Sequence, residues 1–176
     1  GEISMYYDPM IAKLITYGKD RKEACSKLSS ALDAFVIKGV STNIPFVNSV
    51  LTNKKFLSGN ITTAFLEEEY PKGYSGLLKS KEKVLLISLA SLAMKAIEIN
   101  RESKLNKGNY VVIISKHHFK LKYEIISNDV NNIYKIKVGY NSKLYEIVVS
   151  WNIGKPILQI SLDNTESIMQ VSKALS

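Results

Sequence analysis

The fold of this chain is decided by residues 80–101, SKEKVLLISLASLAMKAIEINR. In a helix of this length the apolar positions would point in nearly every direction around the axis. They are Val84, Leu85, Leu86, Ile87, Leu89, Ala90, Leu92, Ala93, Met94, Ala96, Ile97 and Ile99. A helix that is apolar on all sides must be surrounded by other apolar groups. The pattern therefore predicts a buried helix from about Ser80 to Arg101.

A membrane span is the competing interpretation of this stretch. Lys83, Lys95 and Glu98 interrupt it, and the uncharged run that they leave is too short to cross a bilayer. Burial within the protein is therefore favoured, and no membrane partner is expected.

The residues after this helix have the pattern of consecutive β-strands. They are rich in β-branched and aromatic residues, alternate in polarity, and are separated by turn residues such as Asn128-Asp129 and Asp163-Asn164. The predicted strands are Tyr110–Ser115, Phe119–Ile126, Ile133–Gly139, Leu144–Trp151, Ile157–Leu162 and Ser167–Val171. We expect an antiparallel meander wrapped around the helix, a partial β-barrel of the α+β class.

The residues before Gly73 have a mixed α/β pattern. Met10–Tyr17 predicts a strand because it is rich in Ile, Leu, Thr and Tyr. Asp20 and Glu23 have the spacing of a capping box, which predicts the start of an amphipathic helix. Its apolar face would contain Ala24, Leu28, Ala31, Leu32 and Phe35. The further elements expected are a helix after Thr42 or Asn43, with Pro45 in its first turn, and a short helix over Thr63–Glu69.

The segment Pro71–Gly76 separates these two patterns. It contains one proline and two glycines in six residues, which is typical of a linker. We therefore expect two domains, residues 1–73 and residues 74–176.

Several short sequences stand in a specific order along both regions. The first region contains YYDPMI at 6–11, GVSTNIP at 39–45 and EEYPKGY at 68–74, and the second contains SWNI at 150–153 and SLDNT at 161–165. On these residues the chain resembles the α subunits of biotin-dependent acyl-CoA carboxylases. Among them it is most similar to those of propionyl-CoA carboxylases, and methylcrotonyl-CoA carboxylase α subunits are the nearest alternative.

The resemblance implies that residues 1–73 are the C-terminal segment of a biotin carboxylase domain and residues 74–176 a BT domain. In the family, the BT domain is a long helix inside an eight-stranded antiparallel barrel, so the six strands expected here imply a truncated barrel. The complete enzyme uses ATP, Mg and bicarbonate to carboxylate biotin and then transfers the carboxyl group to an acyl-CoA. The family's catalytic groups have no match here, so no catalytic, cofactor-binding or metal residue is expected and the fragment alone is expected to be inactive.

The resemblance also implies two partners, the remainder of the α subunit and a carboxyltransferase β subunit. The candidate contacts with the β subunit lie in a polar link expected over Glu102–Asn109 and at the preceding helix end. They are Arg101, Glu102, Lys104, Leu105, Asn106 and Lys107. The expected location is the cytoplasm, or the mitochondrial matrix in a eukaryote.

The net charge of +8 raises the question of a nucleic-acid partner. Of the 24 basic residues only Arg21 and Arg101 are arginines, and the lysines are scattered along the chain. Because base and phosphate recognition favours the planar guanidinium group, no nucleic-acid partner is expected. The charge and the partial barrel together motivate a second hypothesis, a free-standing basic β-sheet binding module.

Some residues resemble functional groups and are better explained by structure. Lys95, in Ala-Met-Lys-Ala, is similar to a biotinyl lysine, but it lies in the middle of the expected helix and not on a hairpin. His117 and His118 would point to opposite faces of a strand, which disfavours a shared metal. Cys25 fits a small buried apolar residue. Asp8 and Lys13 fit a structural ion pair or cap better than an acid–base pair.

Overall fold

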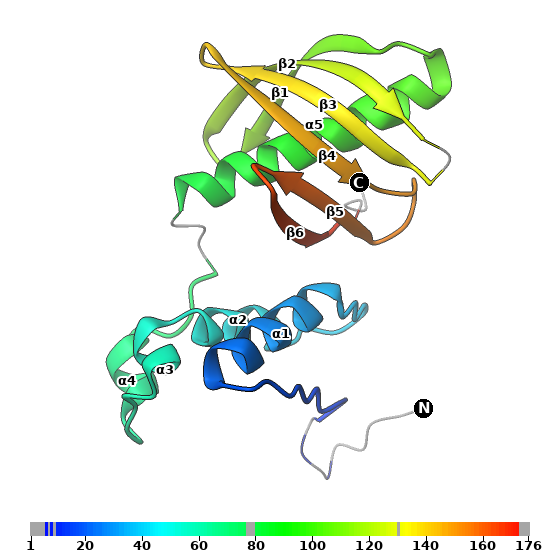
Figure 1. Ribbon diagram of the computed structural model, residues 1–176. Coiled ribbons are helices and arrows are strands. Elements are labelled where there is room, and N and C mark those ends of the chain that lie inside the picture. The colour runs from blue at the N-terminus through cyan, green and yellow to red at the C-terminus, as the bar shows by residue number, and fades with distance from the viewer. Residues whose placement is uncertain (1–5, 7, 9, 77–79, 130, 173–176) are drawn as a thin grey trace. The chain divides into compact units, whose positions relative to one another are not determined.

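The computed structural model describes residues 6, 8, 10–76, 80–129 and 131–172. It divides into two compact units, residues 1–76 (unit 1) and residues 77–176 (unit 2). Figure 1 shows that the described part of unit 1 is helical, whereas unit 2 combines one long helix with a sheet.

Four helices form the regular structure of the described part of unit 1. They are α1 (Arg21–Ala34), α2 (Ile44–Leu51), α3 (Lys54–Ser58) and α4 (Phe65–Glu69). A small cluster of Cys25, Leu32 and Leu51 lies between them, so the expectation that Cys25 is a buried apolar residue is confirmed. Helix α4 starts two residues later than the Thr63 expected from the sequence.

Local capping sets where the helices of unit 1 begin. Asp20 Oδ1 accepts a hydrogen bond from Glu23 N at 2.8 Å, as the capping-box spacing predicts. The Glu23 carboxylate accepts one from Lys19 N, also at 2.8 Å. Asn43 precedes α2 without a side-chain cap, whereas the Asn53 side chain caps α3. Helix α3 was not expected, because five residues are too few to show an apolar period.

The strand expected over Met10–Tyr17 is wrong in this structure. The segment does not form a strand, and the described part of unit 1 provides no other strand with which it can pair. A strand is stable only within a ladder, because its backbone N–H and C=O groups need partners. The segment instead lies along α1, where Thr16 Oγ1 donates to Ala24 O at 3.0 Å, while Ile15 and Tyr17 are 84% and 86% exposed.

Unit 2 contains the long helix and all six strands that the sequence predicts. The helix is α5 (Lys81–Ser103), capped by Ser80, whose Oγ accepts from Lys83 N at 3.3 Å. The strands are β1 (Lys107–Ile114), β2 (His117–Asn128), β3 (Ile133–Tyr140), β4 (Lys143–Ser150), β5 (Ile157–Leu162) and β6 (Thr165–Gln170). They pair in sequence order, every pair antiparallel, so the expected meander is confirmed. The sheet is open, and β1 and β6 are its edges.

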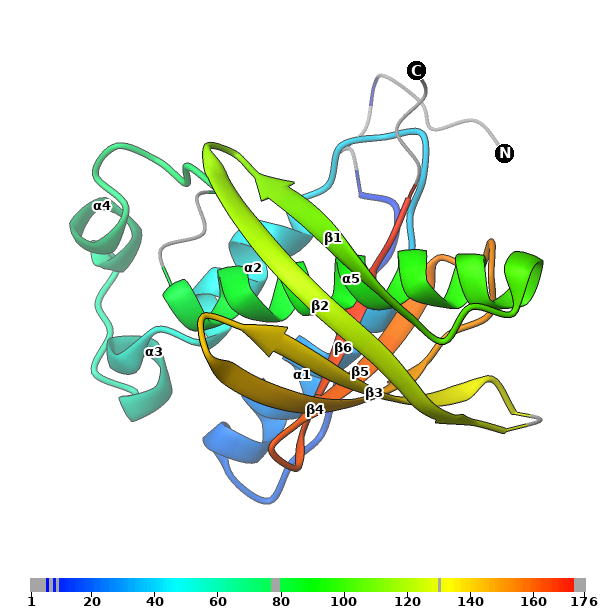
Figure 2. The same cartoon turned by 90° about the horizontal axis from the view of Figure 1, so that it is seen from above.

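Helix α5 packs against the inner face of this sheet. Figure 2 shows β1 and β2 passing in front of the helix and β5 and β6 behind it. Seven residues of α5 are buried: Ser88, Leu89, Ala90, Leu92, Ala93, Ala96 and Ile97. Inward residues of β2 to β5, among them Leu121, Val138, Val149 and Leu158, complete the same core. The expected burial of the helix is therefore confirmed along its middle.

Charged residues alternate across the outer face of the sheet. The strand register places Lys107 opposite Glu124, Glu124 opposite Lys137, and Lys137 opposite Glu146. Lys137 Nζ lies 3.3 Å from Glu146 Oε1. Opposite charges in directly paired positions stabilise a sheet modestly, and a one-residue slip of any of these four strands would turn its charged residue toward the buried face. The row therefore favours the observed register.

Truncating a core residue of α5 tests the packing of unit 2. Leu89 is fully buried against the sheet, so Leu89→Ala is expected to lower the free energy of unfolding by about 2–5 kcal/mol. Leu144→Ala removes the same atoms from an outward position that is 65% exposed, and a change within about 0.5 kcal/mol is expected. Urea unfolding followed by the fluorescence of Trp151, the one tryptophan, measures both. Equal losses for the two variants would contradict the packing.

Lys55 joins α3 to α4 in unit 1. Its Nζ lies 2.7 Å from Glu69 Oε1 and 3.4 Å from Glu68 Oε2, and Asn53 Nδ2 donates to Glu69 Oε2 at 2.8 Å. The hydrogen bonds from Lys55 and then Asn53 lower the pKa of Glu69, and the hydrogen bond to Glu69 raises the pKa of Lys55. A lowered carboxylate pKa contributes stability above the ordinary pKa, and this contribution is lost as the pH falls through the lowered value.

The pKa of Glu69 is therefore expected to rise toward its ordinary value in Lys55→Met, because the hydrogen bond that lowers it most is removed. NMR titration of the glutamate side-chain carboxyl carbons measures it. Lys54→Met is the control, since Lys54 is exposed and forms no ion pair among the described residues. An unchanged Glu69 titration in Lys55→Met would rule out the pair in solution.

Candidate interaction surfaces

The residues expected to contact a partner form a short turn and the two element ends beside it. Arg101 and Glu102 lie on the last turn of α5, which continues to Ser103, and Lys107 is the first residue of β1. The polar link expected over Glu102–Asn109 is therefore wrong in its extent, and the turn consists of residues 104–106. The helix continues to Ser103 and the strand begins at Lys107, although both ends of the link are polar in composition.

Hydrogen bonds hold this turn in one conformation. Lys104 ends the helix in the left-handed region, with φ 59°, and its N–H donates to Asn100 O at 2.9 Å. Asn100 Nδ2 donates to Leu105 O at 3.3 Å and to Asn106 Oδ1 at 2.6 Å. Ile125 N donates to Asn106 O at 2.7 Å, which ties the turn to β2. The turn is thus pinned at both sides by backbone and amide groups.

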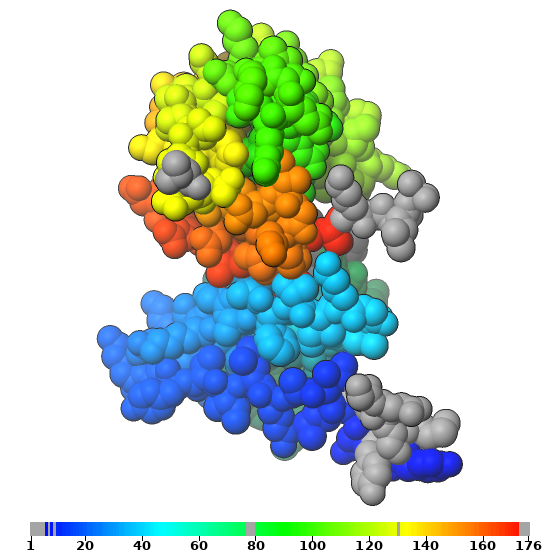
Figure 3. All heavy atoms as spheres, turned by 90° about the vertical axis from the view of Figure 1, so that its right-hand side faces the viewer, coloured from blue at the N-terminus to red at the C-terminus, as the bar shows by residue number. Residues whose placement is uncertain are grey.

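The structure brings all six candidate contact residues to the surface of unit 2. Arg101, Glu102, Lys104, Leu105, Asn106 and Lys107 are exposed. Figure 3 shows the end of α5 and the following turn, in green, at the molecular surface. An exposed leucine among charged residues on a hydrogen-bonded turn is suited to contact with another protein.

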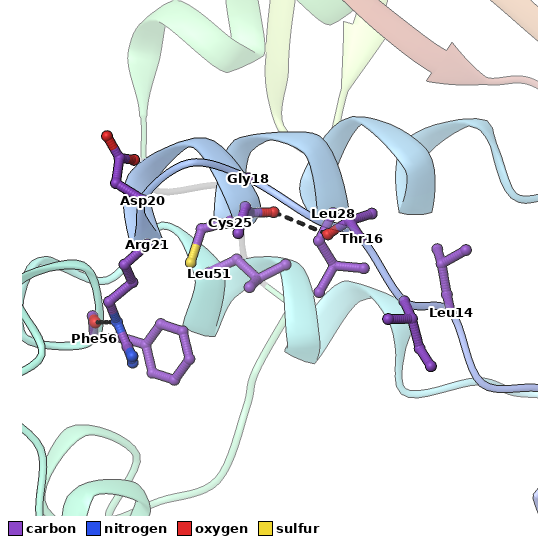
Figure 4. A pocket seen from close by; sticks show the side chains of 11 residues that line it. Leu14, Thr16, Gly18, Asp20, Arg21, Cys25, Leu28, Leu51 and Phe56 are labelled. Carbon is purple, nitrogen blue, oxygen red and sulfur yellow. Dashed lines mark hydrogen bonds between the residues drawn. The ribbon is translucent and has the colours of Figure 1, made fainter.

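Unit 1 has an open groove between the N-terminal segment and its helices (Figure 4). It encloses about 520 Å³. Its lining residues are Leu14, Ile15, Thr16, Gly18, Asp20, Arg21, Ala24, Cys25, Leu28, Leu51 and Phe56. At one end the Arg21 guanidinium lies 4.3 Å from the centre of the Phe56 ring, and its Nε donates to Phe56 O at 2.6 Å. The groove is therefore mainly apolar, and its one cation is already engaged.

Gly18 is required where the N-terminal segment crosses α1 beside this groove. A Cβ atom on Gly18 would lie 2.4 Å from Ala24 N, a distance that no side chain tolerates. The glycine thus permits the close approach of two backbones.

The polar and charged groups that line the groove are already engaged within unit 1. Asp20 is used as a helix cap, Arg21 is held by Phe56, and Cys25 is buried among apolar residues. No glycine-rich turn presents backbone N–H groups toward a phosphate there. Apolar side chains of another polypeptide segment fit this lining better.

Lys95 does not fit a biotin-carrying lysine. It lies within α5, and its Nζ is 3.5 Å from Glu98 Oε2 on the same helix. Lys95 therefore pairs with a carboxylate one helical turn away. Exposing Lys95 on a hairpin would require unwinding the helix whose neighbouring residues Ala93, Ala96 and Ile97 form the core of unit 2.

The other residues singled out in the sequence are not assembled into a site. His117 and His118 are exposed at the start of β2, opposite Ile114 and Ile113, and lie on alternate faces as expected. Asp8 and Lys13 are both exposed, and among the described residues the structure shows no ion pair or cap formed by their side chains. No three His, Cys, Asp or Glu side chains are grouped as metal ligands within the described ranges.

Burial raises the pKa of Tyr123, and the neighbouring Tyr110 adds to the effect. The rings of the two tyrosines are 6.1 Å apart, and Tyr123 is one of the core residues of β2. This shift of the Tyr123 pKa is a consequence of packing in the sheet.

As regards membranes, none of the helices in the described residues is long and apolar enough to span one.

Two domain families match this chain, one in each unit. The biotin carboxylase C-terminal domain matches residues 1–68. The propionyl-coenzyme A carboxylase BT domain matches residues 95–176. The first match ends before the linker, and the second begins inside α5 and includes every strand.

Similar proteins include carboxylase subunits from animals and bacteria. The mitochondrial propionyl-CoA carboxylase alpha chain of Rattus norvegicus is 33% identical over 178 aligned positions, which cover 96% of this chain and 24% of the rat protein. That of Ruegeria pomeroyi is 42% identical over 106 positions, 60% of this chain and 16% of the relative. Mitochondrial pyruvate carboxylase of Mus musculus is 47% identical over 66 positions, 38% of this chain and 6% of the relative.

The chain thus spans about a quarter of the length of the propionyl-CoA carboxylase relatives that it matches along almost all of its own length. The six-stranded antiparallel sheet and the C-terminal end of α5 lie within the residues matched as a BT domain. With both domain matches and these relatives together, the chain belongs, as a partial chain, to the α-subunit family of biotin-dependent carboxylases, and within it is homologous to propionyl-CoA carboxylase α chains.

Proposed function

We propose that this chain is a non-catalytic assembly segment of an acyl-CoA carboxylase, and that propionyl-CoA is the substrate of the complete enzyme. Residues 1–73 complete the biotin carboxylase domain, and residues 74–176 form the BT domain that docks a carboxyltransferase β subunit. The observation that carries the proposal is that the two domain matches occur in one chain, in this order. The methylcrotonyl-CoA carboxylase alternative has less support, because relatives matched over 90–97% of this chain are propionyl-CoA carboxylase alpha chains.

The composition of the surface of unit 1 supports its role as part of a larger domain. Its described residues bury only four large or medium apolar side chains, Cys25, Leu32, Leu51 and Phe65. Its exposed large apolar residues are more numerous: Tyr6, Met10, Ile11, Ile15, Tyr17, Phe35, Val40, Ile61, Leu66 and Tyr74. A unit of this size with so small a core has little stability of its own. Apolar contact with the remainder of the α subunit supplies what it lacks.

The complete enzyme is proposed to use biotin, ATP, Mg and bicarbonate, as the family does. None of these groups is assigned a site on the described residues, and no chemical step is assigned to this chain. Its contribution is to place domains that act on the same biotin. Relatives matched over 90–97% of this chain are named as mitochondrial, which supports the matrix for a eukaryotic protein, and the cytoplasm is proposed otherwise.

A free-standing binding module remains the second candidate, favoured by the net charge of +8 and the open sheet. Such a module would bind RNA or an acidic lipid with a steep dependence on salt. The proposed assembly role requires instead a specific protein partner of defined stoichiometry.

Hydrogen exchange of the whole chain tests the role of unit 1. Amides in the middle of α5 and in β3 and β4 are expected to be protected by the core of unit 2, whereas those of α1 to α4 are expected to exchange much faster, because few apolar residues must be exposed for them to open. Mass spectrometry of peptic fragments measures both. Equal protection in the two units would show that unit 1 has no need of further polypeptide.

Complex formation tests the role of unit 2. The chain mixed with the cognate carboxyltransferase β subunit is expected to elute as a complex whose mass, from light scattering, fits one chain per β subunit. Leu105→Asp, in the exposed turn, is expected to weaken binding about tenfold. Leu144→Asp is the control, because Leu144 is equally apolar and exposed but lies on β4.

Failure of the folded chain to bind this subunit would contradict the docking role. If Leu105→Asp and Leu144→Asp weaken binding equally, the turn is not the site of contact.

A further inference from the structure

The outer face of β1 and β2 carries an apolar pair beside two lysines and a histidine. Val111 and Ile113 point outward from β1 and are 51% and 61% exposed. The register places Lys120 opposite Val111 and His118 opposite Ile113, and Lys122 follows on the same face of β2. All three β2 residues are exposed. We call these five residues the β1–β2 patch, and Figure 2 shows the strands that carry it in front of α5.

Packing within unit 2 does not account for the patch. The inner residues of these strands, such as Val112, Phe119 and Leu121, already cover α5. The outward residues face away from that core. Two β-branched aliphatic side chains on an exposed face are costly in water unless another surface covers them.

The positive charge of the patch is also unbalanced. The outer-face carboxylates Glu124 and Glu146 stand in the charged row with Lys107 and Lys137. Neither Lys120 nor Lys122 forms an ion pair with any residue that the structure describes. A complementary surface would therefore combine an apolar centre with carboxylates around it.

We propose that the β1–β2 patch is a docking surface for an acidic face of the partner subunit of the carboxylase. This inference rests on the proposed function and extends the contact beyond the turn at residues 104–106, along β1 to the opposite end of the strand. A second copy of this chain is a poor occupant, because it would bring Lys120 and Lys122 of two basic chains together. Nucleic acid is a poor occupant because the centre is aliphatic and the cations are not arginine.

Matched double charge reversals in the 176-residue chain test the patch. Lys120→Glu/Lys122→Glu places two carboxylates in it, and Lys135→Glu/Lys143→Glu makes the same change in net charge at exposed positions on β3 and β4. With the cognate carboxyltransferase β subunit as the probe, the Kd is expected to rise at least about tenfold for the first variant and less than about twofold for the second. The wild-type Kd should rise with salt, and that of the patch variant should rise less.

A second variant, Val111→Thr/Ile113→Thr, tests the apolar centre without changing charge or strand propensity. It is expected to raise the Kd at least about fivefold while the salt dependence stays that of the wild type. Circular dichroism and the thermal midpoint of each variant confirm that all chains compared are folded.

The possible results separate this inference from the proposed function. If the wild-type chain binds and the patch variants bind equally well, or if both charge reversals weaken binding alike, the patch is not the contact, while the docking role stands. If the folded wild-type chain fails to bind, the docking role and this inference both fail. If the patch instead binds phosphatidylserine vesicles or single-stranded RNA, and the chain does not bind the subunit, the proposal that an acidic protein surface covers the patch is also wrong.

Discussion

The packing of α5 against the inner face of the sheet is the constraint on which unit 2 depends. Ala93 and Ala96 are fully buried and let the strands approach the helix closely, while Leu89 and Leu92 fill the space beside them. Because alternate residues of every strand are committed to this contact, the remaining residues must form the outer face. The placement of the charged row and of the β1–β2 patch is therefore a consequence of how the helix is buried.

The elements of unit 2 could be predicted from the sequence because each of them is long and regular. The apolar residues of α5 recur over many turns, and β2 to β5 alternate in polarity between clear turn residues. Even so, β1 begins three residues before the predicted Tyr110, and α5 ends two residues after the predicted Arg101. These shifts shorten the link that carries the candidate contact residues, because element ends depend on caps and pairing more than on composition.

What the sequence did not predict depends on neighbours that composition does not reveal. Met10–Tyr17 has the composition of a strand, but a ladder needs a second strand, and the described part of unit 1 has none. The β1–β2 patch depends on the register that puts Lys120 opposite Val111, which no local pattern specifies. The candidate contact residues, by contrast, were identified from the family resemblance, and the structure adds that they form one rigid, exposed surface.

The two units are suited to different kinds of contact. Unit 1 exposes many apolar side chains around a small core, as does a piece cut from a larger domain, so covering them stabilises its own fold. Unit 2 has a continuous core, and its outer face mixes aliphatic and charged groups, as in interfaces between proteins that fold separately. A contact of the first kind adds to the stability of the unit that makes it, whereas one of the second kind can form and dissociate. A chain with both surfaces is therefore suited to be an integral part of one catalytic domain while binding a separately folded one.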